Sequence, residues 1–230
     1  LTEHYTKTRT STAKFERNFA QTYNAVLNFT HTFAKDHNVN LMLGMEYYDN
    51  YKRGFEAKGS GAPTDDFADL NLTDKGEGKR SIDSWHEQYR ILSYFGRLNY
   101  DFKDKYLLSA VFRQDGYSSL LGDNRWGFFP GVSIGWRISE EKFFEKLRPV
   151  VDDLKIRASI GQTGTEKDVK LFDYLSGYTW NNGNAVLDGE LVTGLNQRGL
   201  PITNLSWTKN TTSNIGFDLT MFNNRLKITA

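Results

Sequence analysis

Apolar and polar residues alternate with a period of two in three consecutive segments between Glu87 and Arg137. In the first segment one set of alternate positions holds Leu92, Tyr94, Gly96, Leu98, Tyr100 and Phe102, and the other set holds Ser93, Arg97, Asn99 and Asp101. Successive side chains of a strand point to opposite faces of a sheet, so this pattern predicts a strand with one apolar and one polar face. Phe95 is the bulky exception among the polar positions.

The next two segments repeat the pattern. Tyr106, Leu108, Ala110 and Phe112 alternate with Ser109, Arg113 and Asp115, and then Phe128, Val132, Ile134 and Trp136 alternate with Ser133 and Arg137. Strands of soluble sandwiches usually have about five or six residues. These segments have about ten to fifteen, the length that a tilted strand needs to cross a bilayer. The pattern therefore favours an all-β fold, an antiparallel transmembrane β-barrel.

Alternation elsewhere predicts further strands at about residues 18–30, 39–53, 154–160 and 206–222, with another opening at residue 225. The connections between the strands alternate in length. Short turns are expected at 35–38, 103–104 and 223–224, a medium loop at 118–125, long loops at 54–85 and 164–205, and a compact connector at 139–153 with one helical turn capped by Ser139. Outer-membrane barrels show this alternation of short periplasmic turns and longer extracellular loops. About seven to eight strands alone would leave exposed edges in lipid, so we expect residues 1–230 to be part of a larger barrel.

Composition narrows the classes of protein. No run approaches the roughly 18 apolar residues of a spanning helix, and the mean hydropathy is -0.59, which excludes a helical membrane protein. The 29 basic and 28 acidic residues are mixed along the chain, so nucleic-acid binding is not expected. The absence of Cys excludes disulfides and thiolate metal sites. Residues 1–12 lack the apolar core of a signal peptide, and we expect either a mature chain or one cut at its start.

Aromatic residues make up 14% of the chain, and the Tyr residues lie mostly near the ends of predicted strands. Such positions are typical of the aromatic girdles at the two membrane interfaces of a barrel. Aromatic residues also suit strands in general, which is the plainer explanation.

Five stretches of sequence resemble one family. They are Arg97–Ser109 (RLNYDFKDKYLLS), Phe112–Gly116 (FRQDG), Asn124–Pro130 (NRWGFFP), Gly135–Glu141 (GWRISEE) and Asp153–Gly164 (DLKIRASIGQTG). Together they resemble the barrel of SusC/RagA-like TonB-linked (TonB-dependent) outer-membrane transporters, with a specific match from about Tyr94 to Gly164 and a looser one on both flanks. Gln114 and residues 117–121 depart from the Arg-Asp-Gly-Ser-Ser-rich pattern expected there. We expect this departure to lie in a loop and to bear on ligand contacts more than on the fold.

The resemblance implies a barrel of about 22 strands with an N-terminal plug, located in the outer membrane of a Gram-negative bacterium. It also implies nutrient import driven by the TonB complex, often with a SusD-like surface lipoprotein that captures oligosaccharides or peptides. Such a transporter is not an enzyme and needs no cofactor. We expect the plug domain and the TonB box to be absent from residues 1–230, which would be a partial barrel domain in contact with outer-membrane lipids.

Two groups of residues are candidates for contact with a transported ligand. Arg97, Asn99, Arg113, Asp115, Arg137 and Arg157 occupy polar strand positions and would line a polar lumen, although each could equally belong to structural ion pairs of the wall. Tyr178, Trp180, Asn181 and Asn182 combine aromatic faces with amides in a predicted extracellular loop, which suits sugars or peptides. Packing within the loop or contact with a partner protein would use the same residues.

Two other functions are possible. A soluble β-sandwich carbohydrate-binding module would have shorter strands and a charged outer face. A carbohydrate-active enzyme would need two carboxylates about 5 to 9.5 Å apart across a cleft. No catalytic pair and no metal-binding pattern is identifiable from the spacing of acidic residues and of the four His residues.

Overall fold

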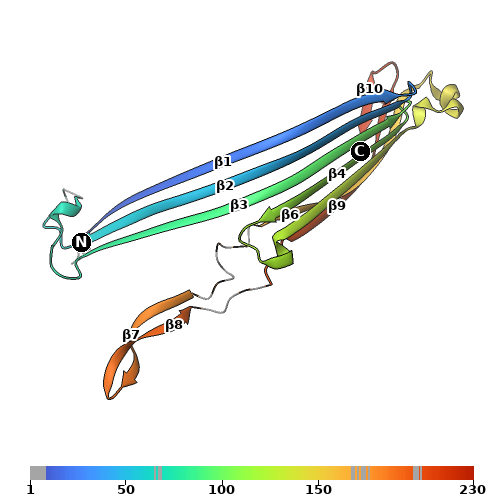
Figure 1. Cartoon of the computed structure of the whole chain (residues 1–230). Helices are drawn as coiled ribbons and strands as arrows, with labels where there is room; N and C mark the ends of the chain where they lie inside the picture. Colours follow the sequence, from blue (N-terminus) through green and yellow to red (C-terminus); the bar gives the residue numbers. More distant parts are fainter. Residues whose placement is uncertain are drawn as a thin grey trace. The chain divides into compact units, whose positions relative to one another are not determined.

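The computed structural model describes residues 9–64, 66, 69–166, 169, 171, 175, 177–198, 202 and 204–230, and between 177 and 198 mainly the backbone. Eight strands form one sheet in the order β1-β2-β3-β4-β5-β6-β9-β10 (Figure 1). Their bounds are β1 Thr10–Phe33, β2 His37–Ser60, β3 Arg80–Phe102, β4 Tyr106–Tyr117, β5 Trp126–Arg137, β6 Val151–Thr165, β9 Thr208–Met221 and β10 Leu226–Thr229. A separate hairpin consists of β7 Gly177–Leu187 and β8 Glu190–Arg198.

Four short 3-10 helices lie between strands: η1 Leu70–Leu72, η2 Gly122–Arg125, η3 Ile138–Glu140 and η4 Lys142–Leu147. In the described part of the chain, no helix combines the length and apolar character that crossing a membrane requires. The sheet is not closed on itself, because β1 and β10 end the strand order. The strand order and the antiparallel pairing of neighbouring strands confirm the expected all-β architecture.

The chain divides into two units. The first comprises residues 1–21 and 49–89. Its described residues form parts of β1, β2 and β3 and the connection 61–79, where Arg80 donates hydrogen bonds to the carbonyl oxygens of Asn71 (3.1 Å) and Thr73 (2.7 Å). On the strands of this unit Phe15 stacks on Phe55, with 5.8 Å between ring centroids.

The second unit comprises residues 22–48 and 90–230, and its strand register produces two chemically different faces. Asn99, Ser109, Ser133, Ser159 and Asn214 lie opposite one another in one row, and Tyr100, Leu108, Ile134, Ala158 and Ile215 form the next row. Because adjacent rows point to opposite sides of a sheet, a polar face and an apolar face result. The alternation predicted from the sequence is confirmed on these five strands.

Aromatic side chains lie at both ends of the apolar face. One end row is Phe102, Tyr106, Trp136, Ile156 and Phe217, and the opposite end holds Tyr94, Phe128 and Trp126. Phe102 stacks on Tyr106 and Tyr94 stacks on Trp126, with centroids 6.2 and 6.3 Å apart. From Trp126 to Trp136 β5 advances about 33 Å, which a tilt of about 35–45° reduces to about 23–27 Å. This height matches the apolar band of an outer-membrane barrel, about 25 Å.

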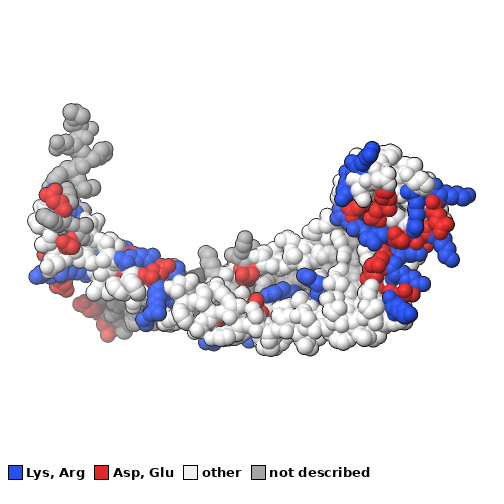
Figure 2. Space-filling view, turned by 90° about the horizontal axis from the view of Figure 1, so that it is seen from above, with Lys and Arg blue, Asp and Glu red and all other residues white. Residues whose placement is uncertain are grey.

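The apolar face is open. Among its residues Ile215 is 83% exposed, and Ile134, Ile160 and Phe128 are exposed as well. Charged residues instead gather at the end of this unit that carries the short turns and η4, as Figure 2 shows. An apolar surface of this extent in water would promote aggregation, so the face needs an apolar environment.

Several predicted boundaries are wrong. The first strand begins at Thr10 instead of near residue 18, and β2 and β3 extend to Ser60 and from Arg80, so the predicted loop 54–85 is shortened to 61–79. The predicted loop 164–205 contains the β7–β8 hairpin. The helical turn in the connector is present as η3 and η4, but Ser139 does not cap it. Its Oγ donates instead to Asp153 Oδ1 at 2.7 Å, and η4 has no side-chain cap.

The short turns at one end of the second unit are joined to each other. Lys103 and Asp104 both adopt positive φ, as do Phe222, Asn223 and Asn224, so the strands reverse within a few residues. The amide N–H of Lys103 donates to Asp36 O (2.9 Å), and that of Arg137 donates to Lys105 O (2.8 Å). The connections at this end therefore form a hydrogen-bonded rim.

Candidate functional site

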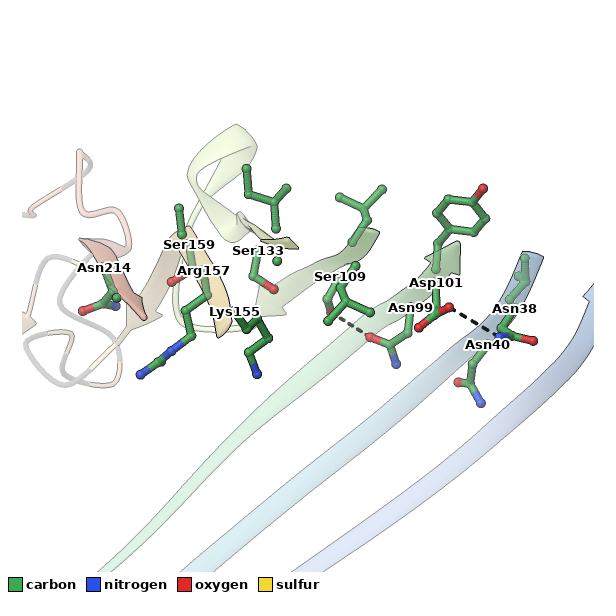
Figure 3. Close-up of a pocket in the computed structure, with 18 of the residues that line it drawn as sticks. Asn38, Asn40, Asn99, Asp101, Ser109, Ser133, Lys155, Arg157, Ser159 and Asn214 are labelled. Atoms are coloured by element: carbon green, nitrogen blue, oxygen red, sulfur yellow. Dashed lines mark hydrogen bonds between the residues drawn. The ribbon is translucent and has the colours of Figure 1, made fainter. Parts of the chain in front are cut away.

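The candidate site is the polar face of the second unit, at the level of the row from Asn99 to Asn214. Strands β4, β5 and β6 each contribute a serine to this row, namely Ser109, Ser133 and Ser159. Ser109 Oγ donates a hydrogen bond to Asn99 Oδ1 at 2.8 Å. In Figure 3 these side chains point to one side of the sheet. A groove of 660 Å³ lies along them. The row offers neutral hydrogen-bonding groups across five strands.

The polar surface continues onto β2 and β1. Asn40 Nδ2 donates to Thr30 Oγ1 (2.9 Å), and Thr32 Oγ1 donates to Asn38 Oδ1 (2.8 Å). Asn38 Nδ2 in turn donates to Asp101 Oδ1 at 3.4 Å, which ties β2 to β3 (Figure 3). Amide and hydroxyl groups bond one another along the wall and retain further donors and acceptors for other polar molecules.

Two cations border this surface on β6. Lys155 Nζ lies 3.0 Å and Arg157 Nε 3.5 Å from Asp218 Oδ2 on β9. The two residues opposite Arg157 are Gly135 and Gly216, so its direct register partners add no side chain beside it, and the nearest carboxylate is that of Asp218. Arg157 keeps about half of its side chain exposed, lines the groove, and extends to the same side of the sheet as Lys155 (Figure 3).

A second polar cluster surrounds Arg113, further along β4. Its Nε donates to both oxygens of Asp115 (2.8 and 3.0 Å), and its Nη2 donates to Ser93 Oγ (2.9 Å) and Glu46 Oε1 (3.3 Å). Ser93 is fully buried and Asp115 nearly so. The carboxylates of Asp115 and Glu46 favour a cation at this position. A guanidinium can in addition donate hydrogen bonds to Asp115, Glu46 and Ser93 at the same time. Arg113 is therefore held in one orientation.

Phe95, the exception in the sequence pattern, has a definite place in this cluster. The guanidinium carbon of Arg113 lies 5.6 Å from the Phe95 ring centroid, which is cation–π distance. Beneath the ring lies Gly44, where an added Cβ would come within 2.4 Å of ring carbons. The missing side chain at Gly44 thus makes room for an aromatic ring on a polar face.

Phe129 repeats this arrangement on β5. Its ring covers Gly164 of β6, where a Cβ would come within 2.0 Å of the ring, and packs edge-on against Trp207 with centroids 5.5 Å apart. Trp207 Nε1 donates to Arg125 O (3.1 Å), which anchors the segment before β9 to the end of η2. Both rings are buried, so the polar face contains a small local core.

The six residues predicted for the lumen wall fall into different settings. Asn99 and Arg157 belong to the groove, and Arg113 and Asp115 bond each other. Arg137 lies on the same face by register but at the rim, with its Nε 3.4 Å from Asp153 Oδ1. Arg97 is exposed opposite Val111, and the described residues place no carboxylate within ion-pair distance of it. That these six side chains face a lumen remains a prediction.

Tyr178, Trp180, Asn181 and Asn182 lie on β7 of the separate hairpin, and their side chains are outside the described residues. The prediction that they contact a ligand stays untested. Asn38, Asn40, Ser133 and Ser159 were not singled out by the sequence as a group. Each sits at a polar position of its own strand, but only the register reveals that they share a level. In the described part of the chain no cluster of three or more His, Asp or Glu residues could hold a metal ion.

The chain is similar to a family of known proteins. Residues 2–230 match the family model described as TonB dependent receptor-like, beta-barrel. The chain is 34% identical over 209 residues to the TonB-dependent receptor SusC of Bacteroides thetaiotaomicron, covering 89% of this chain and 20% of SusC. It is 30% identical over 200 residues to the TonB-dependent receptor P26 of Formosa agariphila, covering 87% of this chain and 20% of P26.

Solved structures show the same fold. The RagAB peptide importer in the open-open state superposes with a TM-score of 0.81 at 23% identity, covering 98% of this chain and 24% of that one. The closed-closed state gives a TM-score of 0.79 at 23% identity, with 95% of this chain and 23% of that one covered. The chain spans about a fifth of the length of the curated relatives that it matches.

Proposed function

Because the chain belongs to the TonB-dependent receptor-like β-barrel family, we propose that it forms one sector of the barrel wall of an outer-membrane nutrient importer. The observation that carries this proposal is the two-faced sheet. Its apolar face has aromatic rows about 23–27 Å apart, and its opposite face carries a row of hydroxyl and amide side chains. Such a sheet is stable where lipid covers one face and water the other.

The two open edges, β1 and β10, support assignment to a sector of a larger barrel. Unpaired strand edges carry N–H and C=O groups that lipid cannot satisfy, and further strands of the parent barrel would pair with them. The plug domain and the TonB box belong, in this proposal, to other parts of the parent protein. The alternative of a soluble β-sandwich module finds no support in the fold or in the similar proteins, which are named as TonB-dependent receptors or as a peptide importer.

The lumen side of the sector provides a wetted path for the transported molecule. The groove from Asn38 to Asn214 presents amides and hydroxyls, and apolar residues such as Val39 and Leu107 line it as well. Its charged lining residues are Asp101, Lys155 and Arg157. Amides and hydroxyls hydrogen-bond to sugar hydroxyls and to peptide groups equally well, so the substrate class we propose is oligosaccharides or peptides. Similarity to SusC and to the RagAB fold supports the same class and supports cooperation with a SusD-like surface lipoprotein and the TonB complex.

The first experiment separates the two faces in the full-length protein. This sector has no Cys, so single cysteines at Ser133 and at the adjacent Ile134 carry an environment-sensitive fluorophore without competing sites in it. In reconstituted vesicles the label at Ile134 should be quenched by nitroxide-bearing acyl chains, and the label at Ser133 should not. Equal quenching at both positions would refute the assignment of the two faces.

The second experiment addresses transport. A strain that lacks the full-length gene should take up labelled oligosaccharides, or labelled peptides, more slowly than a complemented strain, and only one of the two classes should respond. A tagged full-length protein should co-purify with a surface lipoprotein from detergent-solubilised outer membranes. Unchanged uptake of both classes would contradict the proposed substrates while leaving the barrel assignment intact.

A further inference from the structure

The connection between β5 and β6, residues 138–150, does not extend away from the sheet but is fastened to it through Glu141. Glu141 Oε1 accepts hydrogen bonds from Tyr106 Oη (2.7 Å) and Trp136 Nε1 (3.2 Å), and Oε2 accepts one from Lys105 Nζ (3.1 Å). Tyr106 and Trp136 belong to the aromatic end row of the apolar face. The connection is therefore held on the side of the sheet that the proposed function assigns to lipid.

The rest of the connection is internally fixed. Phe144 is buried, and so is Ser139, whose Oγ donates to Asp153. Arg148 Nη2 donates to Ser139 O (3.2 Å) and lies 3.4 Å from Glu140 Oε2. The hydrogen bonds at Glu141 and Arg148 thus hold both ends of η4, so the side chains that η4 exposes have defined directions.

Three of the exposed side chains are apolar. Phe143 is 67%, Leu147 54% and Val150 45% exposed, although Phe144 beside them is buried. They occur at the end of the unit where charged residues otherwise gather (Figure 2). Phe143 follows Glu141 by two residues, and Glu141 is bonded to Tyr106 and Trp136 of the aromatic row. The three apolar side chains are thus connected through the chain to that row, and together they form an exposed apolar group.

Two lysines accompany these apolar side chains. Lys142 and Lys146 are exposed, and the described residues place no carboxylate within ion-pair distance of either ammonium group. By contrast Glu140 and Glu141 are engaged by Arg148 and Lys105. Apolar side chains with neighbouring Lys are typical of segments that lie in a membrane interface, since the chain of Lys is long enough to reach lipid phosphates.

We infer that η4 and the three residues after it form an interfacial membrane anchor: Phe143, Leu147 and Val150 enter the acyl-chain boundary of the periplasmic leaflet, and Lys142 and Lys146 contact phospholipid phosphates. This inference rests on the proposed function, because it needs the apolar face to meet lipid. We assign η4 to the periplasmic leaflet because the connections at this end of the sheet are short, and short connections are periplasmic in outer-membrane barrels. Charge complementarity and continuity with the aromatic row select a phospholipid surface as the occupant.

The test uses the full-length transporter with single cysteines at Phe143, Glu145 and Ile134, after replacement of any cysteine elsewhere in the parent protein. Each carries the same fluorophore in vesicles of phosphatidylethanolamine and phosphatidylglycerol. The label at Phe143 should be quenched severalfold more by nitroxide lipids than the label at Glu145, a polar exposed neighbour on η4. Iodide in the aqueous phase should show the reverse order.

The outcomes separate the two proposals. If Ile134 is quenched by nitroxide lipid and Phe143 is not, the barrel sector stands and the anchor is refuted. If Ile134 is not quenched either, the proposed function itself fails. Protection of Phe143 from both quenchers would show that another protein segment covers it, which also overturns the anchor. Replacing Lys142 and Lys146 by Gln should weaken the lipid quenching at Phe143, and unchanged quenching would remove the phosphate contacts from the proposal.

Discussion

A charge placed in the middle of the apolar face tests the orientation of the sheet most directly. Val132 lies on β5 between Trp126 and Trp136, about 20 Å along the strand from the first and about 13 Å from the second. With the tilt of a barrel strand these distances become about 15 and 10 Å, which puts Val132 near the middle of the band. Val132 is only partly covered by neighbouring side chains, so its replacement removes little packing.

Val132→Arg should therefore destabilise the full-length barrel by about 2–4 kcal/mol, the cost of an Arg near the bilayer midplane. Ser133→Arg is the matched control, since it adds the same charge one residue away on the polar face and should cost less than about 1 kcal/mol. Reversible urea unfolding in vesicles, followed by the mobility of unheated samples on gels, measures both. Equal destabilisation by the two variants would refute the orientation of the faces, and so would a larger loss for Ser133→Arg.

Three further predictions follow from local contacts. Phe129→Ala should lower the free energy of unfolding by about 3–5 kcal/mol, because it empties a buried ring site; a loss under about 1 kcal/mol in the same urea assay would contradict that packing. Arg113→Met should lower the free energy of unfolding by about 1–3 kcal/mol, a range that allows for the partial exposure of the guanidinium. Adding Asp115→Asn should recover part of this loss. Strictly additive effects of the two substitutions would show that the pair is not coupled. Hydrogen bonds from Tyr106 and then Lys105 lower the pKa of the Glu141 carboxyl, so its stabilising effect is present above the ordinary carboxyl pKa and is lost as the pH falls through the depressed one. A spin label on η4 should thus gain mobility in acid, and Glu141→Gln should be mobile at every pH; a label whose mobility does not depend on pH in the unmodified protein would argue against this contact.

The sequence predicted the alternation well because it is a local property. On β4 and β5 the predicted apolar and polar positions agree with the two faces, and the short turns near residues 103–104 and 223–224 occur where Lys, Asp and Asn take positive φ. The resemblance in residues 94–164 pointed to the family that the comparisons show.

The ends of long strands were harder to predict. β2 continues through Gly54 and β3 begins at Arg80, among polar and glycine residues that resemble loop sequence. Pairing with neighbouring strands extends them, since each added residue gains ladder hydrogen bonds whatever its own propensity. Ser139 likewise matched a helix cap locally, but its hydroxyl donates a hydrogen bond to Asp153 of the following strand instead.

The amino-acid sequence by itself determined which side chains of each strand face the same way, because that depends only on the two-residue period of an extended backbone. Tertiary structure alone decided which strands' polar positions meet at one level. Register is a relation between residues far apart in the chain, and a shift by one residue would exchange the faces of a whole strand. The serine and asparagine row, the Arg113 cluster over Phe95 and the attachment of η4 by Glu141 all depend on that register.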